Sequence, residues 1–265
     1  MQKTRLGACA LTMMLAATTA LAQSALPQQG YVRPNGASPE WETPAVSHAD
    51  VKPYEDDTPY AAVALPPPPE IGSAIDRDDV AAVLARQQVD DARWQMAEED
   101  SHLLYDRFAD ALGVPIKRST LPVLVSILNR AEKQVVGPVF TAKGQYGRAR
   151  PYQRLQLTRV CGKDKAPAPD PDVQKRTSYP SGHSAYGWVA AMVLSRVAPD
   201  RAPQLLRRAV EYGDSRVICG VHFPSDIEAG RVMAATVLGH LDGNSEFQND
   251  VATAKAELAK ARAAK

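Results

Sequence analysis

From Ser73 to the C-terminus, apolar residues recur at the three- and four-residue spacing of amphipathic helices, and the two-residue alternation of strands is nearly absent. Only residues 155–158 alternate, and they suit a loop equally well. Such a chain buries its apolar faces helix against helix, which predicts an all-α, single-domain bundle of about seven helices. The expected helices span residues 76–100, 103–112, 119–137, 182–197, 203–212, 225–241 and 245–264.

The segment before this region has a different composition. Ten of the 21 prolines fall between Pro27 and Pro69, and the run from Pro66 to Pro69 favours a polyproline II conformation. We therefore predict an extended, partly disordered Pro-rich arm over residues 23–70 and assign the helical domain to residues 71–265.

The first 22 residues have the pattern of an export signal. Lys3 and Arg5 precede an uncharged apolar stretch, and Ala20-Leu21-Ala22 provides the small-residue cleavage pattern before Gln23. The alternative, a membrane anchor, needs a longer apolar run. The pattern predicts a signal peptide over residues 1–22 and a periplasmic or secreted protein. No later segment reaches membrane-spanning length, so no membrane span is expected.

The charge balance restricts the partners. The chain has 31 basic and 30 acidic residues, and 45% of its residues are hydrophobic. A bulk electrostatic attraction to nucleic acid is therefore not expected, and a wholly disordered protein is excluded.

Export also changes the interpretation of the cysteines. Cys9 is lost with the signal peptide, so Cys161 and Cys219 remain, and in an oxidising compartment they predict one disulfide. Two separate buried thiols are the alternative. No Cys-x-x-Cys or paired-His spacing is present, so we expect no metal site.

Basic residues gather in one part of this otherwise balanced chain. Between Glu132 and Asp164 there is no acidic residue but there are seven basic ones, which indicates an anion site. A solvated basic loop is the alternative for such a run taken alone. The basic residues are Lys133, Lys143, Arg148, Arg150, Arg154, Arg159 and Lys163.

Two further segments favour the anion site. Ser181 and Gly182 stand where a loop enters a predicted helix, so free backbone N–H groups can bind an oxyanion there. Asp226 follows His222 by four residues, close enough to orient its ring within one helical turn. With His183, these groups match phosphoryl transfer through a covalent histidine.

The order of these residues resembles a known signature. It is the three-part motif shared by type 2 phosphatidic acid phosphatases, bacterial class A non-specific acid phosphatases and vanadium haloperoxidases, and the match looks closest to the class A enzymes from about Tyr60 onward. The three parts are Lys143-x6-Arg150-Pro151, Pro180-Ser181-Gly182-His183 and Ser215-Arg216-x5-His222-x3-Asp226.

The resemblance implies a role for each matching residue. His222 resembles the nucleophile, Asp226 the carboxylate that orients it, and His183 the general acid for the leaving group. The phosphate-binding residues of the family correspond to Lys143, Arg150, Ser181, Gly182 and Arg216. The family uses no metal and no cofactor, so a secreted, metal-independent acid phosphatase of broad specificity is expected, with small phosphorylated metabolites as substrates.

Other readings stay open at this stage. A vanadate-dependent haloperoxidase uses the same motif, because vanadate mimics the pentacoordinate phosphoryl transition state. A non-catalytic, phosphate-binding secreted protein is the alternative outside the enzymes. The physiological substrate, the capacity to transfer phosphate to alcohols, and assembly into a homo-oligomer are not determined by the sequence.

Overall fold

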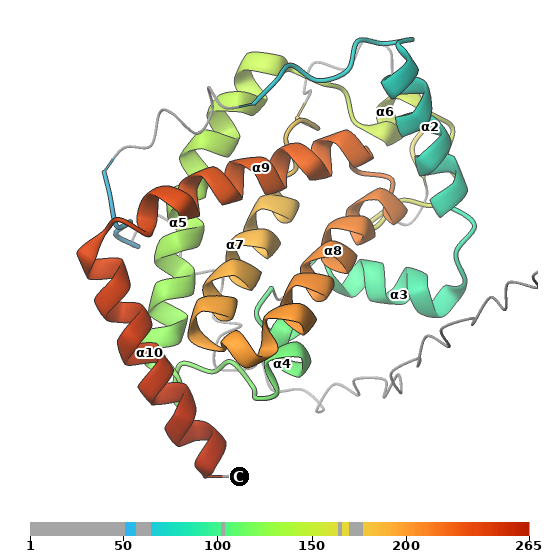
Figure 1. Ribbon diagram of the computed structural model, residues 1–265. Coiled ribbons are helices and arrows are strands. Elements are labelled where there is room, and N and C mark those ends of the chain that lie inside the picture. The colour runs from blue at the N-terminus through green and yellow to red at the C-terminus, as the bar shows by residue number, and fades with distance from the viewer. Residues whose placement is uncertain (1–50, 57–64, 102–103, 164–165, 170–176, 265) are drawn as a thin grey trace, which may run out of the picture. The chain divides into compact units, whose positions relative to one another are not determined.

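Helix α7 (Gly182–Val197) lies at the centre of the fold, where it packs against α5 (Pro122–Tyr146), α8 (Ala202–Ile218) and α9 (Pro224–Leu241) (Figure 1). Small residues such as Gly187 and Ala190 are buried on α7 and allow its neighbours to approach closely. A side chain at Gly187 would collide with Tyr212 of α8, since an added Cβ would lie 2.5 Å from that ring. The central position of α7 fixes where its N-terminus, and therefore the Ser181–His183 segment, can lie.

The computed structural model describes residues 51–56, 65–101, 104–163, 166–169 and 177–264, which all belong to one unit. Within these ranges the structure is helical and contains no strand, which confirms the all-α prediction. The proposed signal peptide, residues 1–22, lies outside the described residues. The remaining elements are α2 (Ala74–Arg86), α3 (Asp91–Glu99), α4 (Asp106–Leu112), α6 (Pro151–Arg154), the 3-10 helix η1 (Pro199–Arg201) and α10 (Ser245–Ala263).

The single helix predicted over residues 76–100 is wrong. It is two helices, α2 and α3, separated at residues 87–90. Gln87 is the C-cap of α2, and its side-chain amide donates to the carbonyl of Ile218, at 2.9 Å. Asp90 then starts α3 as its N-cap, accepting a hydrogen bond from the backbone N–H of Arg93. The break turns α3 toward α8.

Two other helices are longer than predicted. Helix α5 continues through Gly137 and Pro138 to Tyr146, and α8 continues to Ile218. The buried face of α5 extends beyond the proline through Val139 and Ala142, so tertiary packing outweighs the local helix-breaking signals. These extensions place Lys143 and Arg216 in the last turns of their helices.

Parts of the segment assigned to the Pro-rich arm pack against the helices. The Tyr54 ring is buried, stacks edge-on to Phe247 at 5.2 Å and donates to Asp250. Leu65 is also buried, and its carbonyl accepts a hydrogen bond from the hydroxyl of Tyr146. Residues on both sides of the undescribed stretch 57–64 thus contribute to the core of the helical domain.

No helix among the described residues has the length and apolar character needed to cross a membrane.

Candidate active site

Two cations predicted to bind phosphate converge on the loop before α7. Lys143 Nζ donates to the backbone carbonyls of Thr177 and Pro180, each at 2.5 Å. Arg150 donates to the side chain and carbonyl of Thr177 and to the carbonyl of Val221. The shared partner Thr177 places both cations in one site, held by backbone oxygens rather than by carboxylates.

The electrostatics of this pair follow from burial. Burial and the charge of Arg150 lower the pKa of Lys143 to about 7, with Asp226 acting in the opposite direction. Burial likewise lowers the pKa of Arg150. A bound anion would relieve this repulsion between neighbouring cations, so the site favours a negatively charged ligand.

The N-terminus of α7 adds hydrogen-bond donors. Ser181 is the N-cap, and its Oγ accepts from the backbone N–H of Ser184 at 3.2 Å. The backbone N–H of Ser181 donates to the carbonyl of Asp226, which ties the start of α7 to α9. Gly230 permits this approach, because an added Cβ would lie 2.5 Å from the carbonyl of Ser181. Gly182 is the first helical residue, as predicted.

His222 lies between a carboxylate and a cation. It directly precedes the N-cap of α9, Phe223, and is almost fully buried. Its Nδ1 lies 3.5 Å from Asp226 Oδ2, and its Nε2 lies 3.5 Å from Arg150 Nη1. Burial lowers the pKa of His222 well below its usual range; Asp226 acts against this shift, while Arg150 and Lys143 reinforce it. The ring is therefore neutral in the empty site.

Asp226 lies in the first turn of α9 with no exposed surface. Its Oδ2 accepts from the Ser178 hydroxyl at 2.6 Å and the Phe223 backbone N–H at 2.8 Å, and its Oδ1 accepts from Arg148 at 2.7 Å. Burial alone would raise the pKa of Asp226, but hydrogen bonding to His222 and the charge of Arg148 lower it to about 2. The carboxylate is therefore ionised.

His183 occupies a different environment on the first turn of α7. Its Nε2 lies 3.4 Å from the backbone carbonyl of Ser101, and its ring stacks on Tyr212 at 6.4 Å between centroids. The ring is only partly buried. Burial and the nearby charge of Arg216 lower the pKa of His183 to about 3. Lys143 and Arg150 contribute to the same shift.

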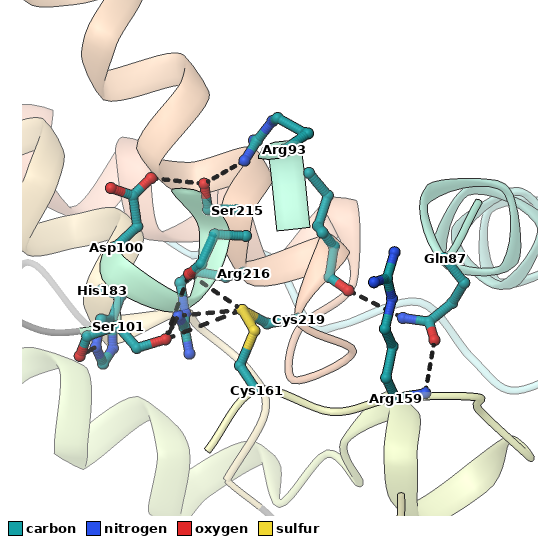
Figure 2. Close-up of a disulfide and its surroundings, with 12 residues drawn as sticks. Gln87, Arg93, Asp100, Ser101, Arg159, Cys161, His183, Ser215, Arg216 and Cys219 are labelled. Atoms are coloured by element: carbon teal, nitrogen blue, oxygen red, sulfur yellow. Dashed lines mark hydrogen bonds between the residues drawn. A yellow bond between two sulfur atoms is a disulfide. The ribbon is translucent and has the colours of Figure 1, made fainter. Parts of the chain in front are cut away.

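Figure 2 shows how Arg216 is connected to the disulfide. Arg216 Nη1 donates to Ser101 Oγ at 2.5 Å and lies 3.6 Å from Cys219 Sγ. Cys219 is bonded to Cys161, as the two-cysteine count predicted, with a Cα–Cα distance of 4.8 Å. The neighbouring Ser215 hydroxyl donates to the buried carboxylate of Asp100 at 2.6 Å. The disulfide therefore lies beside one of the candidate phosphate-binding groups.

The predicted site residues thus come from α5, α7, α8 and α9, from the N-cap of α6 and from the loops before α7 and α9. Sequence reasoning missed three contributors: Arg148, which contacts Asp226; Asp79, which contacts Arg148; and Ser101, which contacts Arg216 and His183. Arg148 belonged to the basic cluster but was not distinguished within it. Asp79 and Ser101 lie far from the motifs in sequence, and no spacing or composition pattern around them indicates a site residue.

Within the described ranges, no group of three or more His, Cys, Asp or Glu side chains is arranged to hold a metal ion.

Known proteins resemble this chain over most of its length. Residues 121–241, which include all the motif residues, match the family model of the PAP2 superfamily. An acid phosphatase of Zymomonas mobilis is 34% identical over 203 residues, 75% of each chain. Non-specific acid phosphatases of Providencia stuartii and Salmonella typhimurium are 36% and 34% identical over 202 residues, covering 74% and 73% of this chain and 79% and 78% of theirs.

The fold and the site define an all-α protein in which two histidines and three cations gather around the N-terminus of α7. The extent of the similarity settles the family: the chain belongs to the PAP2 superfamily, among the bacterial non-specific acid phosphatases. The predicted enzyme class, an acid phosphatase, is confirmed.

Proposed function

We propose that this protein is a secreted, metal-independent acid phosphatase that hydrolyses phosphate monoesters through a phosphohistidine on His222. The observation that carries the proposal is the orientation of the His222 ring between two charged groups. Nδ1 faces the Asp226 carboxylate and Nε2 faces the Arg150 guanidinium. A carboxylate on one side keeps the proton on Nδ1, so Nε2 keeps its lone pair toward the anion site.

The first half of the reaction transfers the phosphoryl group. His222 Nε2 attacks phosphorus, the bond to the leaving oxygen breaks, and His183 donates a proton to that oxygen. Lys143, Arg150 and Arg216 offset the charge of the equatorial oxygens, and the Ser181 hydroxyl and the Gly182 N–H add neutral donors. Asp226 stabilises the positive charge that develops on the His222 ring.

The second half returns the enzyme to its starting state. His183, now neutral, accepts a proton from water as the water oxygen attacks phosphorus, and the bond to His222 Nε2 breaks to release phosphate. An alcohol could replace water, which would make the enzyme a phosphotransferase as well. Because the pKa of His183 is low in the empty site, a bound phosphate dianion must raise it for the acid role.

Several features support the other parts of the proposal. The sequence of residues 1–22 supports secretion. The three cations around the anion site provide the charge stabilisation that a metal supplies in other phosphatases. Small phosphorylated metabolites with different leaving groups are the proposed substrates, which corresponds to broad specificity.

Rapid-quench labelling with a labelled aryl phosphate tests this proposal. Wild-type protein should form an acid-labile, base-stable phosphoenzyme, and activity should persist in EDTA and be inhibited by orthovanadate in competition with phosphate. Activity that is lost in EDTA and restored by a divalent metal would overturn the metal-free mechanism. Bromide oxidation by peroxide after vanadate loading, without phosphate release, would indicate a haloperoxidase instead.

A further inference from the structure

A buried guanidinium lies behind the His222–Asp226 pair, on the side away from the anion site. Arg148 Nη1 donates to Asp226 Oδ1 and to Ser225 Oγ, both at 2.7 Å. Arg148 Nη2 donates to Asp79 Oδ2 at 2.9 Å. The Arg148 guanidinium also covers the ring of Phe223, with 4.3 Å from its carbon to the centroid. Its hydrogen bonds thus go to protein groups of α2 and α9.

Asp79 completes this arrangement from α2. Its Oδ1 accepts from the backbone N–H of Ser225 at 3.0 Å, and its Oδ2 also accepts from the Ser225 hydroxyl. Both Asp79 and Arg148 are buried. Asp79 therefore holds the first turn of α9, which carries Asp226, and holds the guanidinium that contacts Asp226.

The charges in this cluster are unequal. Asp76 is paired with Arg154 at 2.7 Å, and Asp79 is paired with Arg148. With Asp226 included, three carboxylates face two guanidinium groups, which leaves this cluster with one net negative charge, while Arg150 and Lys143 act on the His222 ring in the opposite sense. If Asp79 were absent, Arg148 would keep Asp226 and, at 3.6 Å, Asp76 as its carboxylate partners, so more of its charge would act on Asp226 and weaken the effect of Asp226 on the ring.

We propose that Arg148 and Asp79 are positioning residues for the nucleophile: Arg148 fixes the Asp226 carboxylate so that Oδ2 faces His222, and Asp79 balances the Arg148 charge so that Asp226 remains effective. This inference rests on the proposed role of His222. The positively charged ring that forms during phosphoryl transfer needs the Asp226 charge, whereas substrate binding in the ground state does not.

The geometry explains why a fork-shaped cation is required. Oδ2 of Asp226 already accepts from Ser178 and Phe223, and its distance to His222 Nδ1 is 3.5 Å. A bond to Oδ1 from the opposite side prevents the carboxylate from rotating away from the ring. Arginine can hold Asp226 with one nitrogen and Asp79 with the other, whereas lysine offers a single point charge.

The test compares kcat with the inhibition constant for inorganic phosphate in Arg148→Gln, Arg148→Lys and Asp79→Asn. We expect kcat to fall about 100-fold, 10-fold and 10-fold, respectively, because misplaced catalytic groups cost on this order. The inhibition constant should stay within about two-fold, since neither residue contacts the anion site. Arg154→Gln is the matched control: Arg154 pairs with Asp76 and lies over the same Phe223 ring without a hydrogen bond to Asp226.

The outcomes distinguish the positioning role of Arg148 and Asp79 from the proposed function of His222 itself. Wild-type kcat in both Arg148→Gln and Asp79→Asn would overturn the positioning role, as would an equal loss in Arg154→Gln, which would indicate general destabilisation. If Arg148→Gln does not fold, Arg148→Lys and Asp79→Asn decide the question by the same criterion. Absence of a wild-type phosphoenzyme would instead refute the function of His222 itself, whatever the variants show.

Discussion

The two histidines of the site lie in opposite environments. His222 is almost completely buried and faces Asp226, which is itself held by Ser178, Phe223 and Arg148. His183 is partly exposed, and its described polar contact is a backbone carbonyl, that of Ser101. One ring is fixed by charged groups, and the other is in contact with neutral ones.

This difference shows how one site can give two histidine side chains different roles. In the proposed mechanism, the carboxylate next to His222 stabilises a ring that becomes positively charged while it bonds to phosphorus. At His183, where the partner is a neutral carbonyl and the cations lower the pKa, the charged form is stabilised mainly by the ligand's own negative charge. His183 is thus suited to gain and lose a proton with each substrate.

The largest expected effect separates the two rings by covalent chemistry. His222→Ala should lower turnover by about five orders of magnitude and form no phosphoenzyme, because the nucleophile is lost. His183→Ala should still form phosphoenzyme from an activated aryl phosphate and accumulate it, since that leaving group departs without a proton. Rapid-quench labelling of both variants measures this. Stable labelling of the His222 variant would contradict the assignment.

A second experiment varies the leaving group. With an alkyl phosphate, His183→Ala should lower kcat by about 10³-fold, which is within the range for general acid catalysis. With an aryl phosphate, the variant should lower the rate of the phosphorylation step by only about 10-fold. The wild-type optimum should lie near pH 5 to 6.5, roughly, and its alkaline limb should be altered in the variant. An alkaline limb that is the same in both proteins would exclude His183 as the acid.

The disulfide provides a smaller and more local test. It joins residues 58 apart in sequence and lies beside Arg216, so Cys161→Ser should remove about 4 kcal/mol of stability and weaken phosphate binding. Thermal unfolding and the phosphate inhibition constant measure the two effects. Intact mass after alkylation without reductant is the control, and two alkylated thiols in the native exported protein would contradict the bridge.

The smallest effect is on stability against pH. The pKa of His183 is about 3 in the folded protein, while an unfolded histidine titrates near 6.5, roughly. Between these values the unfolded chain binds more protons, so stability decreases as pH falls through this window, by at most about 1.4 kcal/mol per pH unit. His183→Gln should reduce that slope in phosphate-free buffer.

Denaturant titrations between pH 4 and pH 6.5 are the measurement, because Asp226, whose pKa is lowered to about 2, adds to the slope in the same direction but mainly below this range. The slope that remains in the variant should combine His222, whose pKa is also lowered, with an opposite contribution from Glu132, whose pKa burial raises to about 7. Saturating phosphate should flatten the wild-type slope, since the anion stabilises a protonated His183. An unchanged slope in His183→Gln would show that this ring does not titrate as described.

The sequence pattern was sufficient to predict those structural features whose physical cause is local. The Ser181 N-cap, the helix beginning at Gly182 and the stop at Gly113 follow from short-range backbone preferences. Helical periodicity predicted the all-α fold for the same reason. The motif residues could be selected from sequence because phosphoryl transfer requires particular side chains in a recognisable order.

Other features depended on contacts between distant segments. The break between α2 and α3 falls where the Gln87 side chain bonds to Ile218 of α8, and the continuation of α5 past Pro138 accompanies burial of its far end. Local propensity cannot anticipate either, because the partners lie elsewhere in the chain.

The charge environment of His222, the proposed nucleophile, was likewise decided by the tertiary structure. Asp79 lies 147 positions before Asp226, and its carboxylate acts there only because α2 packs against α9 and Arg148 bridges the two. The sequence by itself determined which chemical groups are available to this protein. The fold decided which of them share a buried site, where distances of a few ångströms and the loss of water set their charges.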